Sequence, residues 1–193
     1  MRNLLWIILF GLFFSIFFAS CGGDSRTYAR QIDEERALID NFIKRQGIVI
    51  TNTMPHDSVF LAKGNENLFF RSSSGLLYRL EEPNSPPSPP DTIIRGVSVN
   101  FFYIEYTLTE RSDTADFRSP QSFPFGNTFI FGGGPTVSTS TAFIEAFGYM
   151  KRSGTKARLI VPHRIGFNPP LVRPLGYDLE IKFFIHPNTP RTN

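Results

Sequence analysis

The spacing of apolar residues along the chain predicts one long helix followed by a region of strands. Between Ser25 and Gln46, apolar side chains recur every three or four positions, and charged residues fill the positions between them. That period is typical of an amphipathic helix, and Gly47 stands where a C-cap is expected. The apolar stripe consists of Tyr28, Ile32, Ile39, Phe42 and Ile43. We expect this stripe to pack on the rest of the chain, with an exposed stalk as the alternative.

From Ile48 onward, short runs of alternating apolar and polar residues are separated by Gly, Pro, Asn and Ser, a pattern that indicates antiparallel strands. The runs predict strands over 48–51, 76–80, 97–108, 128–131, 157–161 and 177–185. In the run 97–108 the apolar positions change parity near Phe102, which predicts a β-bulge at that point.

One further helix is predicted over 141–151, where helical spacing relates Phe143, Phe147 and Met150. Its candidate N-caps are Ser138, Thr139 and Ser140. The order of strands, a single helix and more strands predicts an α+β domain, in which an antiparallel sheet wraps around one short helix.

The first 21 residues form a separate segment. Arg2 precedes a nearly continuous apolar run over 4–19, and the small residues Ala19 and Ser20 stand directly before Cys21, the single cysteine of the chain. A helix that crosses a bilayer needs roughly 20 apolar residues, so this shorter run is typical of a removable signal peptide. The segment resembles a bacterial lipoprotein signal.

That resemblance implies cleavage after residue 20, a lipid on the Cys21 sulfur and acylation of the new amino terminus by a fatty acid such as palmitate. The protein would then be anchored by lipid to a membrane of the cell envelope, at the periplasmic face or the cell surface. The alternatives are an ordinary secreted protein and a signal anchor that is never cut. Because no second cysteine is present, an exported domain would depend on packing alone for its stability.

Length and charge narrow the function classes further. The 193 residues, less the signal, suit one domain of ordinary size with an extension. The 20 Lys and Arg and the 17 Asp and Glu are scattered without a basic stripe, which argues against nucleic acid as a partner. The 21 phenylalanines and 6 tyrosines are a high aromatic content for a chain of this size, which favours a binding site lined by aromatic side chains.

No motif for metal, phosphate or nucleophilic chemistry is present in the sequence. The histidines are isolated and lack the spacings of zinc sites: His56, His163 and His186. The serine clusters lack a nucleophile elbow, and the glycines 132–134 lack the lysine and hydroxyl of a phosphate loop. We therefore expect no metal and no cofactor.

Four segments, taken in order, resemble parts of the FKBP-type peptidyl-prolyl isomerases, in particular lipid-anchored members of bacteria with two membranes. The first is Gly75-Leu-Leu-Tyr-Arg-Leu80, after which a proline-containing linker leads to a strand that ends at Tyr103. The strongest match is Phe143-Ile-Glu-Ala-Phe-Gly-Tyr-Met150 followed by Lys156-Ala-Arg-Leu-Ile-Val-Pro162. The last is Pro174-Leu-Gly-Tyr-Asp-Leu-Glu180.

The resemblance covers about 75–185. It implies an FKBP-like antiparallel sheet half-wrapped around one short helix within a domain over 48–193. Before this domain we expect a signal peptide over 1–20 and a segment over 21–47 with the lipidated cysteine and the N-terminal helix.

Carried over position by position, the resemblance implies an aromatic pocket. Phe143 takes the place of the family's tryptophan at the pocket floor. Tyr103 and Tyr177 correspond to two walls, and Phe167 corresponds to the flap tyrosine. These four residues are the predicted catalytic set. The predicted substrate-binding residues are Phe117, Phe129, Phe131 and Val161.

Several polar positions depart from the family pattern. The aspartate that usually follows the wall phenylalanine is Arg118 here, and a glycine that usually follows the pocket tyrosine is Glu105. The floor tryptophan is replaced by Phe143, and the flap hydroxyl is absent at Phe167. The apolar character of the pocket is kept, while its polar rim is changed.

The resemblance implies that the protein catalyses rotation about X-Pro bonds in exported polypeptides that contain proline. Rotation breaks amide resonance at a barrier of about 18–20 kcal/mol, and a dry apolar pocket binds the twisted amide better than the planar one. The polar departures favour an alternative, a catalytically weak or inactive binding module of an envelope machine such as a gliding or secretion apparatus. A periplasmic ligand-binding barrel is a third hypothesis.

Overall fold

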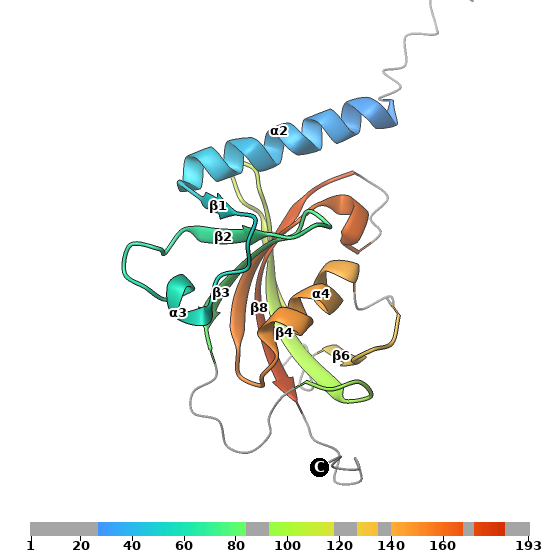
Figure 1. The fold of residues 1–193 in the computed structure, drawn as a ribbon. Coiled ribbons are helices and arrows are strands. Elements are labelled where there is room, and N and C mark those ends of the chain that lie inside the picture. The colour runs from blue at the N-terminus through green and yellow to red at the C-terminus, as the bar shows by residue number, and fades with distance from the viewer. Residues whose placement is uncertain (1–26, 84–92, 118–126, 135–139, 168–171, 184–193) are drawn as a thin grey trace, which may run out of the picture. The chain divides into compact units, whose positions relative to one another are not determined.

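The computed structural model of the protein describes residues 27–83, 93–117, 127–134, 140–167 and 172–183, which Figure 1 shows in colour. The chain divides into two compact units, residues 1–31 and 32–193. Of the first unit the structure describes residues 27–31, where the Thr27 hydroxyl accepts a hydrogen bond from the Arg30 amide. The predicted signal and Cys21 lie outside the described residues. Within the described part, no helix is both long and apolar enough to cross a membrane.

The elements with a clear period in the sequence are present. The two predicted helices are α2 (Tyr28–Gln46) and α4 (Thr141–Met150). The predicted strands are β1 (Val49–Thr51), β3 (Leu77–Glu82), β4 (Ser98–Thr107), β6 (Asn127–Ile130), β7 (Lys156–Val161) and β8 (Leu175–Phe183). The sequence pattern missed helix α3 (Asp57–Phe60), strands β2 (Leu68–Arg71) and β5 (Thr114–Asp116) and the 3-10 turn η1 (His163–Ile165). Elements this short establish no period.

Within the described residues, the strands form one sheet in the order β1-β2-β3-β7-β8-β4-β5, with β6 also paired to β4. Neighbouring strands are antiparallel, as predicted, except that β1 and β2 run parallel with Val49 opposite Leu68. A parallel pair needs a crossover of a dozen or more residues, and the segment 52–67 with α3 supplies it. The sheet is therefore mixed, which corrects the expectation of a purely antiparallel one.

A different helix packs against each face of the sheet, as the two separate cores show. One face, here called the α4 face, carries the larger core, and α4 buries Phe143, Ala146 and Phe147 in it. The other face, the α2 face, has a smaller core against which α2 packs Ile39, Phe42 and Ile43. The buried members of this smaller core are Phe69, Leu77, Leu108 and Ile160. The part of the stripe from Ile39 to Ile43 therefore packs on the sheet, so the stalk alternative is wrong for this part of α2, whereas Tyr28 at the other end of the stripe is 64% exposed.

The β-bulge predicted near Phe102 is also wrong. Strand β4 pairs with β8 in one continuous register, from Val99 opposite Phe183 to Thr107 opposite Leu175. The parity of the apolar positions changes because the covering helix changes. Up to Tyr103 the buried apolar residues of β4 lie in the core of the α4 face, whereas Leu108 is buried in the core of the α2 face and Tyr106 packs against it. A strand covered on both faces can thus change parity without an extra residue.

Capping residues mark the start of α4 and the end of α2. The Ser140 hydroxyl accepts a hydrogen bond from the Phe143 amide at 3.3 Å and caps the start of α4. Gly47 has a φ of +61°, and the amides of Gly47 and Ile48 donate to the carbonyls of Lys44 and Ile43, which is the Schellman arrangement. The N-cap fixes the start of α4, and with it the position of Phe143 in the first turn.

Gly176 is required by the close approach of Tyr106 on the α2 face. The two residues pair directly across β4 and β8, and a Cβ atom at Gly176 would lie 2.1 Å from the Tyr106 ring. We expect Gly176→Ala to lower the free energy of unfolding by about 1–3 kcal/mol, because the ring must move from its place over the sheet. Urea denaturation measures the change.

Gly148→Ala is the matched control. A Cβ atom there meets nothing within 4 Å, and the residue lies inside α4. We expect this variant to gain roughly 0.5–1 kcal/mol from the lower entropy of its unfolded chain. Equal stability of Gly176→Ala and the parent would contradict the close approach of Tyr106.

Candidate functional site

The four residues of the predicted catalytic set come together on the α4 face. Tyr103 lies on β4, Phe143 on α4, Phe167 shortly after η1, and Tyr177 on β8. Each of the four rings contacts the other three, with centroid distances between 4.9 and 6.4 Å. We call this group the aromatic cluster. Its catalytic role remains a prediction.

The sheet register explains how the two tyrosines reach the same place. Tyr103 pairs with Leu179, and Glu105 pairs with Tyr177, across the antiparallel strands β4 and β8. Side chains two positions apart on a strand, and those directly opposite on its neighbour, share a face. The rings of Tyr103 and Tyr177 therefore lie diagonally on the α4 face, at 5.7 Å.

Phe143 is the centre of the aromatic cluster. Its side chain is fully buried, and its ring stands nearly perpendicular to those of Tyr103, Phe167 and Tyr177, at 76°, 82° and 84°. Edge-to-face contacts place the positive edge of one ring on the negative face of another, and they contribute beyond the burial of apolar area. The geometry thus fixes the orientation of the surrounding rings as well as their position.

The predicted substrate-binding residues lie at different distances from this centre. Phe117 joins the aromatic cluster directly, because its ring stacks on Tyr103 at 4.7 Å. Phe129 is one layer removed and contacts the ring of Phe147 at 6.0 Å. Phe131 and Val161 pack in the same core. The predicted pocket lining is therefore uneven, with Phe117 the nearest of its rings.

The prediction missed two rings as members of this group. Phe101 contacts Phe143 at 5.5 Å and Phe147 at 5.3 Å, and it stacks on Tyr103 at 6.0 Å. Phe147 also contacts Phe143, at 6.2 Å. The signal was in the spacing, because Phe101 stands two residues before Tyr103 on a strand and Phe147 stands four residues after Phe143 on a helix.

The two tyrosine hydroxyls of the aromatic cluster stay protonated. Burial, with a smaller contribution from the Glu105 carboxylate, raises the pKa of Tyr103 from its ordinary value of 10.0 to about 12. Burial and then Glu105 raise the pKa of Tyr177 further. The Tyr177 hydroxyl is buried and forms no hydrogen bond within 3.5 Å to a described residue, although the Glu105 carboxylate lies near enough to raise its pKa as a hydrogen-bond acceptor. It is a neutral donor inside an apolar cluster, so an amide carbonyl that entered could accept from it.

The histidines do not form a metal site within the described residues. His56 caps α3 through its ring, and His163 is hydrogen-bonded to Glu35. His186 lies outside the described residues. No group of three or more His, Cys, Asp or Glu side chains in the part of the chain that the structure describes could hold a metal ion.

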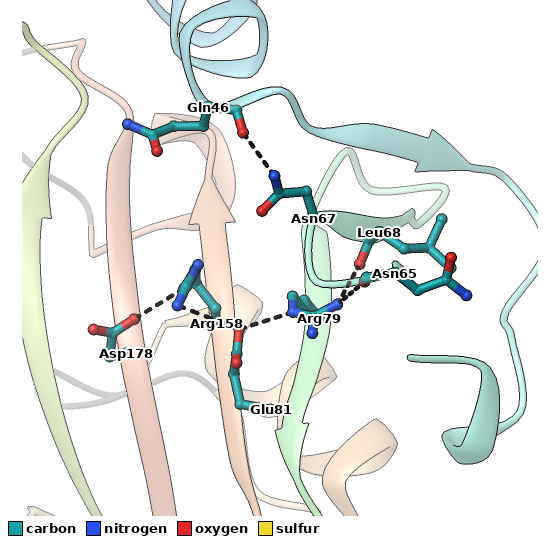
Figure 2. Close-up of polar contacts among 8 residues, drawn as sticks. All are labelled: Gln46, Asn65, Asn67, Leu68, Arg79, Glu81, Arg158 and Asp178. Carbon is teal, nitrogen blue, oxygen red and sulfur yellow. Dashed lines mark hydrogen bonds and ion pairs between the residues drawn. The ribbon is translucent and has the colours of Figure 1, made fainter. Parts of the chain in front are cut away.

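A row of charged side chains crosses the α2 face, as Figure 2 shows. Arg79 is buried and contacts Glu81 at 2.9 Å, Glu81 contacts Arg158 at 3.4 Å, and Arg158 contacts Asp178 at 3.4 Å. A hollow of about 270 Å³ lies beside the row, next to Phe42 of α2. Each charge of the row has an opposite neighbour. We therefore interpret the row as a connection between β3, β7 and β8 rather than as a site for a charged ligand.

Among solved structures, a DUF4827 family protein from Parabacteroides distasonis is similar to this chain, at 22% identity and a TM-score of 0.66 over 81% of this chain and 96% of that one. At this identity the similarity shows the fold alone. FkpA from Escherichia coli aligns at 15% identity and a TM-score of 0.49, over 90% of this chain and 70% of that one.

A peptidyl-prolyl cis-trans isomerase from Pseudomonas syringae pv. tomato aligns at 16% identity and a TM-score of 0.46, over 83% of this chain and 97% of that one. Both TM-scores lie below 0.5, so we draw no conclusion about this chain from these two structures. No protein-family model and no curated protein matches the chain.

The raised pKa of Tyr103 predicts how stability depends on pH. The folded state keeps the Tyr103 proton that the unfolded state releases near pH 10.0, so stability falls as the pH rises from there to about 12. We expect Tyr103→Phe to lose less stability over this range than the parent. Urea denaturation at a series of alkaline pH values measures the difference, and parallel pH profiles would contradict the burial of the hydroxyl.

Proposed function

We propose that the protein is a lipid-anchored, FKBP-like peptidyl-prolyl cis-trans isomerase, or folding helper, that acts on proline-containing exported polypeptides. The observation that supports this function is the mutual contact of Tyr103, Phe143, Phe167 and Tyr177. These four rings lie far apart in the sequence, at the positions where the family resemblance implies a pocket.

Such a site needs no nucleophile, metal or cofactor. Rotation about an X-Pro bond makes and breaks no covalent bond, and its barrier of about 18–20 kcal/mol arises from the loss of amide resonance. The twisted amide is less dipolar than the planar one, so apolar walls bind it better than the ground state. Only the difference between the two affinities increases the rate.

The residues of the aromatic cluster have distinct roles in this proposal. Phe143 is fully buried, so it forms the floor for a proline ring only when the Phe167 ring moves aside, and Tyr103 forms a wall. Phe167, which is half-buried, closes the site from the segment after η1. The Tyr177 hydroxyl, which stays protonated beside Glu105, donates to the carbonyl of the twisted amide.

A second candidate function is binding of proline-containing segments without turnover, as a module of an envelope machine. The departures from the family pattern favour it: Glu105 stands where a glycine is usual, and Phe167 lacks the hydroxyl of the flap tyrosine. The same apolar contacts would then bind the planar and the twisted X-Pro amide equally well, which gives affinity for the peptide but no acceleration of isomerisation.

The location is part of the same proposal. Arg2, the apolar run 4–19 and Cys21 form the lipoprotein pattern, and a signal of this type delivers the protein to the cell envelope. A single acyl chain anchors only reversibly, whereas two or more chains on one cysteine hold a protein stably. A lipid anchor at Cys21 would keep the site close to chains that emerge from the membrane.

A protease-coupled assay with a short X-Pro peptide tests the activity. We expect the parent to accelerate isomerisation and Tyr177→Phe to lower kcat/KM about five- to tenfold, the loss of one neutral hydrogen bond. Phe167→Ala should lose more, because it removes the closing ring. Tyr106→Phe, a tyrosine of the same strand as Tyr103 on the other face, is the matched control and should keep the parent's rate.

The outcomes separate the two candidate functions. A rate equal to that in buffer defeats the enzymatic proposal. If calorimetry then detects binding of the same peptide, and Phe167→Ala abolishes it, the binding module is favoured. If the parent neither binds nor isomerises proline peptides, both candidates fail.

Fatty-acid labelling in the native host tests the anchor. We expect incorporation of label into the parent, an amino terminus at Cys21, and recovery in the membrane fraction. Cys21→Ala should remain unlabelled. A labelled Cys21→Ala variant would contradict the lipoprotein assignment, as would an unlabelled parent. In the latter case, retention of residues 1–20 would indicate an uncleaved signal anchor, and their loss an ordinary secreted protein.

A further inference from the structure

Glu35 is a buried carboxylate on a helix whose other residues are half-buried or exposed. It is 5% exposed, whereas no other residue of α2 is buried. Burying a carboxylate is costly unless hydrogen bonds replace its water. The local sequence pattern does not explain why an acidic residue is buried at this position. The explanation lies in the hydrogen bonds that Glu35 forms.

Both oxygens of Glu35 accept hydrogen bonds from one residue, His163. The His163 backbone amide donates to Oε1 at 2.6 Å, and its ring Nδ1 lies 2.7 Å from Oε2. Both side chains are nearly enclosed, with 6% of Glu35 and 12% of His163 exposed. Hydrogen bonds to a carboxylate are stronger than neutral ones, and two on one residue fix its orientation as well as its distance.

His163 begins the turn that leads to the aromatic cluster. It is the first residue of η1, and Phe167 follows four positions later. The turn is compact, because the amides of Ile165 and Gly166 both donate to the Pro162 carbonyl, at 3.2 Å each. Ile165 is buried in the core of the α4 face. Because the turn is held by these contacts, we expect a displacement of His163 to displace Phe167 as well.

We propose that Glu35 is a positioning residue for the aromatic cluster. Its two hydrogen bonds to His163 hold the turn 162–167 in place, so that the Phe167 ring stays packed on Tyr103, Phe143 and Tyr177. The consequence for catalysis rests on the proposed function. The consequence for the position of Phe167 does not, and it can be measured without a substrate.

A single tryptophan reports on the position of the turn. The only tryptophan of the chain is Trp6, so Phe167→Trp in a Trp6→Phe background places the sole indole at the end of the turn. Into this reporter chain we introduce Glu35→Ala, which removes both hydrogen bonds, and Glu35→Gln, whose side-chain oxygen accepts from the His163 amide and whose NH2 group can donate to Nδ1 of the neutral ring. Ile43→Ala is the matched control, since it weakens the packing of the same helix without touching His163.

We expect Glu35→Ala to shift the emission of the reporter indole to longer wavelength and to increase its quenching by acrylamide, at temperatures where circular dichroism shows a folded domain. Glu35→Gln and Ile43→Ala should keep the emission of the parent reporter. An unchanged emission in Glu35→Ala would overturn the proposal. An equal shift in Ile43→Ala would also overturn it, because the effect would then come from α2 packing in general.

Hydrogen exchange provides a second measurement if Glu35→Ala in the reporter chain does not fold. In the chain without the reporter, His163→Ala removes the ring hydrogen bond and keeps the backbone one. Loss of one hydrogen bond to a charged group should make the amides of residues 163–167 exchange roughly 10- to 100-fold faster, with strand β7 unchanged. Equal acceleration in β7, or none in the turn, counts against the proposal.

The activity assay distinguishes this proposal from the proposed function. If the protein is an isomerase, Glu35→Ala should lower kcat/KM while Glu35→Gln and Ile43→Ala retain it. If the protein has no isomerase activity but the reporter indole responds to Glu35→Ala, the positioning role stands and only the enzymatic function fails. If activity is present and Glu35→Ala leaves kcat/KM unchanged, Glu35 does not position the site for catalysis, and the proposal is overturned in that part.

Discussion

The packing of the Phe143 ring is the interaction on which the α4 face depends. This fully buried side chain meets the rings of Phe101, Tyr103, Phe147, Phe167 and Tyr177. The partners come from two strands, from α4 itself and from the segment after η1, so one ring joins elements that are far apart in the sequence. Stability and the proposed function therefore share one physical basis, because the rings that fill the core also provide the apolar surface that the proposed reaction needs. A change at Phe143 cannot separate the two, whereas a change at the half-buried Phe167, or removal of the Tyr177 hydroxyl alone, can.

Two helices pack on opposite faces of the sheet, which explains why the pattern of apolar and polar residues changes along a strand. The helix α4 covers one face with a large aromatic core, and α2 covers part of the other with Ile39, Phe42 and Ile43. Strand β4 contributes to both cores. Its apolar residues face α4 in the first half of the strand and α2 near its end, without a β-bulge. Beside the apolar residues that α2 covers, the same face carries paired charges such as Arg158 and Asp178. The pattern of each strand thus records which helix lies over it.

One polar contact connects the two sides of this arrangement. Glu35 belongs to the helix of the α2 face, and its partner His163 begins the turn whose far end packs into the aromatic cluster. Apolar packing is tolerant of small shifts, but two hydrogen bonds to a buried carboxylate are not, since an unpaired acceptor in that place is costly. A rigid polar contact at one end of a short turn is therefore a physically sound way to fix an apolar ring at the other end.

The sequence by itself determined the helices α2 and α4, six of the eight strands of the described sheet, the end of α2 at Gly47 and the start of α4 after 138–140, because hydrophobic period and capping are local properties. The family resemblance, read from residues spaced over 75–185, also named the four rings that meet. Tertiary structure alone decided the parallel pairing of β1 and β2 and the continuous register of β4. It also decided the burial of Glu35, whose partner lies 128 residues away. The physical reason is the same in each case: which face of an element is covered, and by what, depends on segments that are distant in the chain, and no local period contains that information.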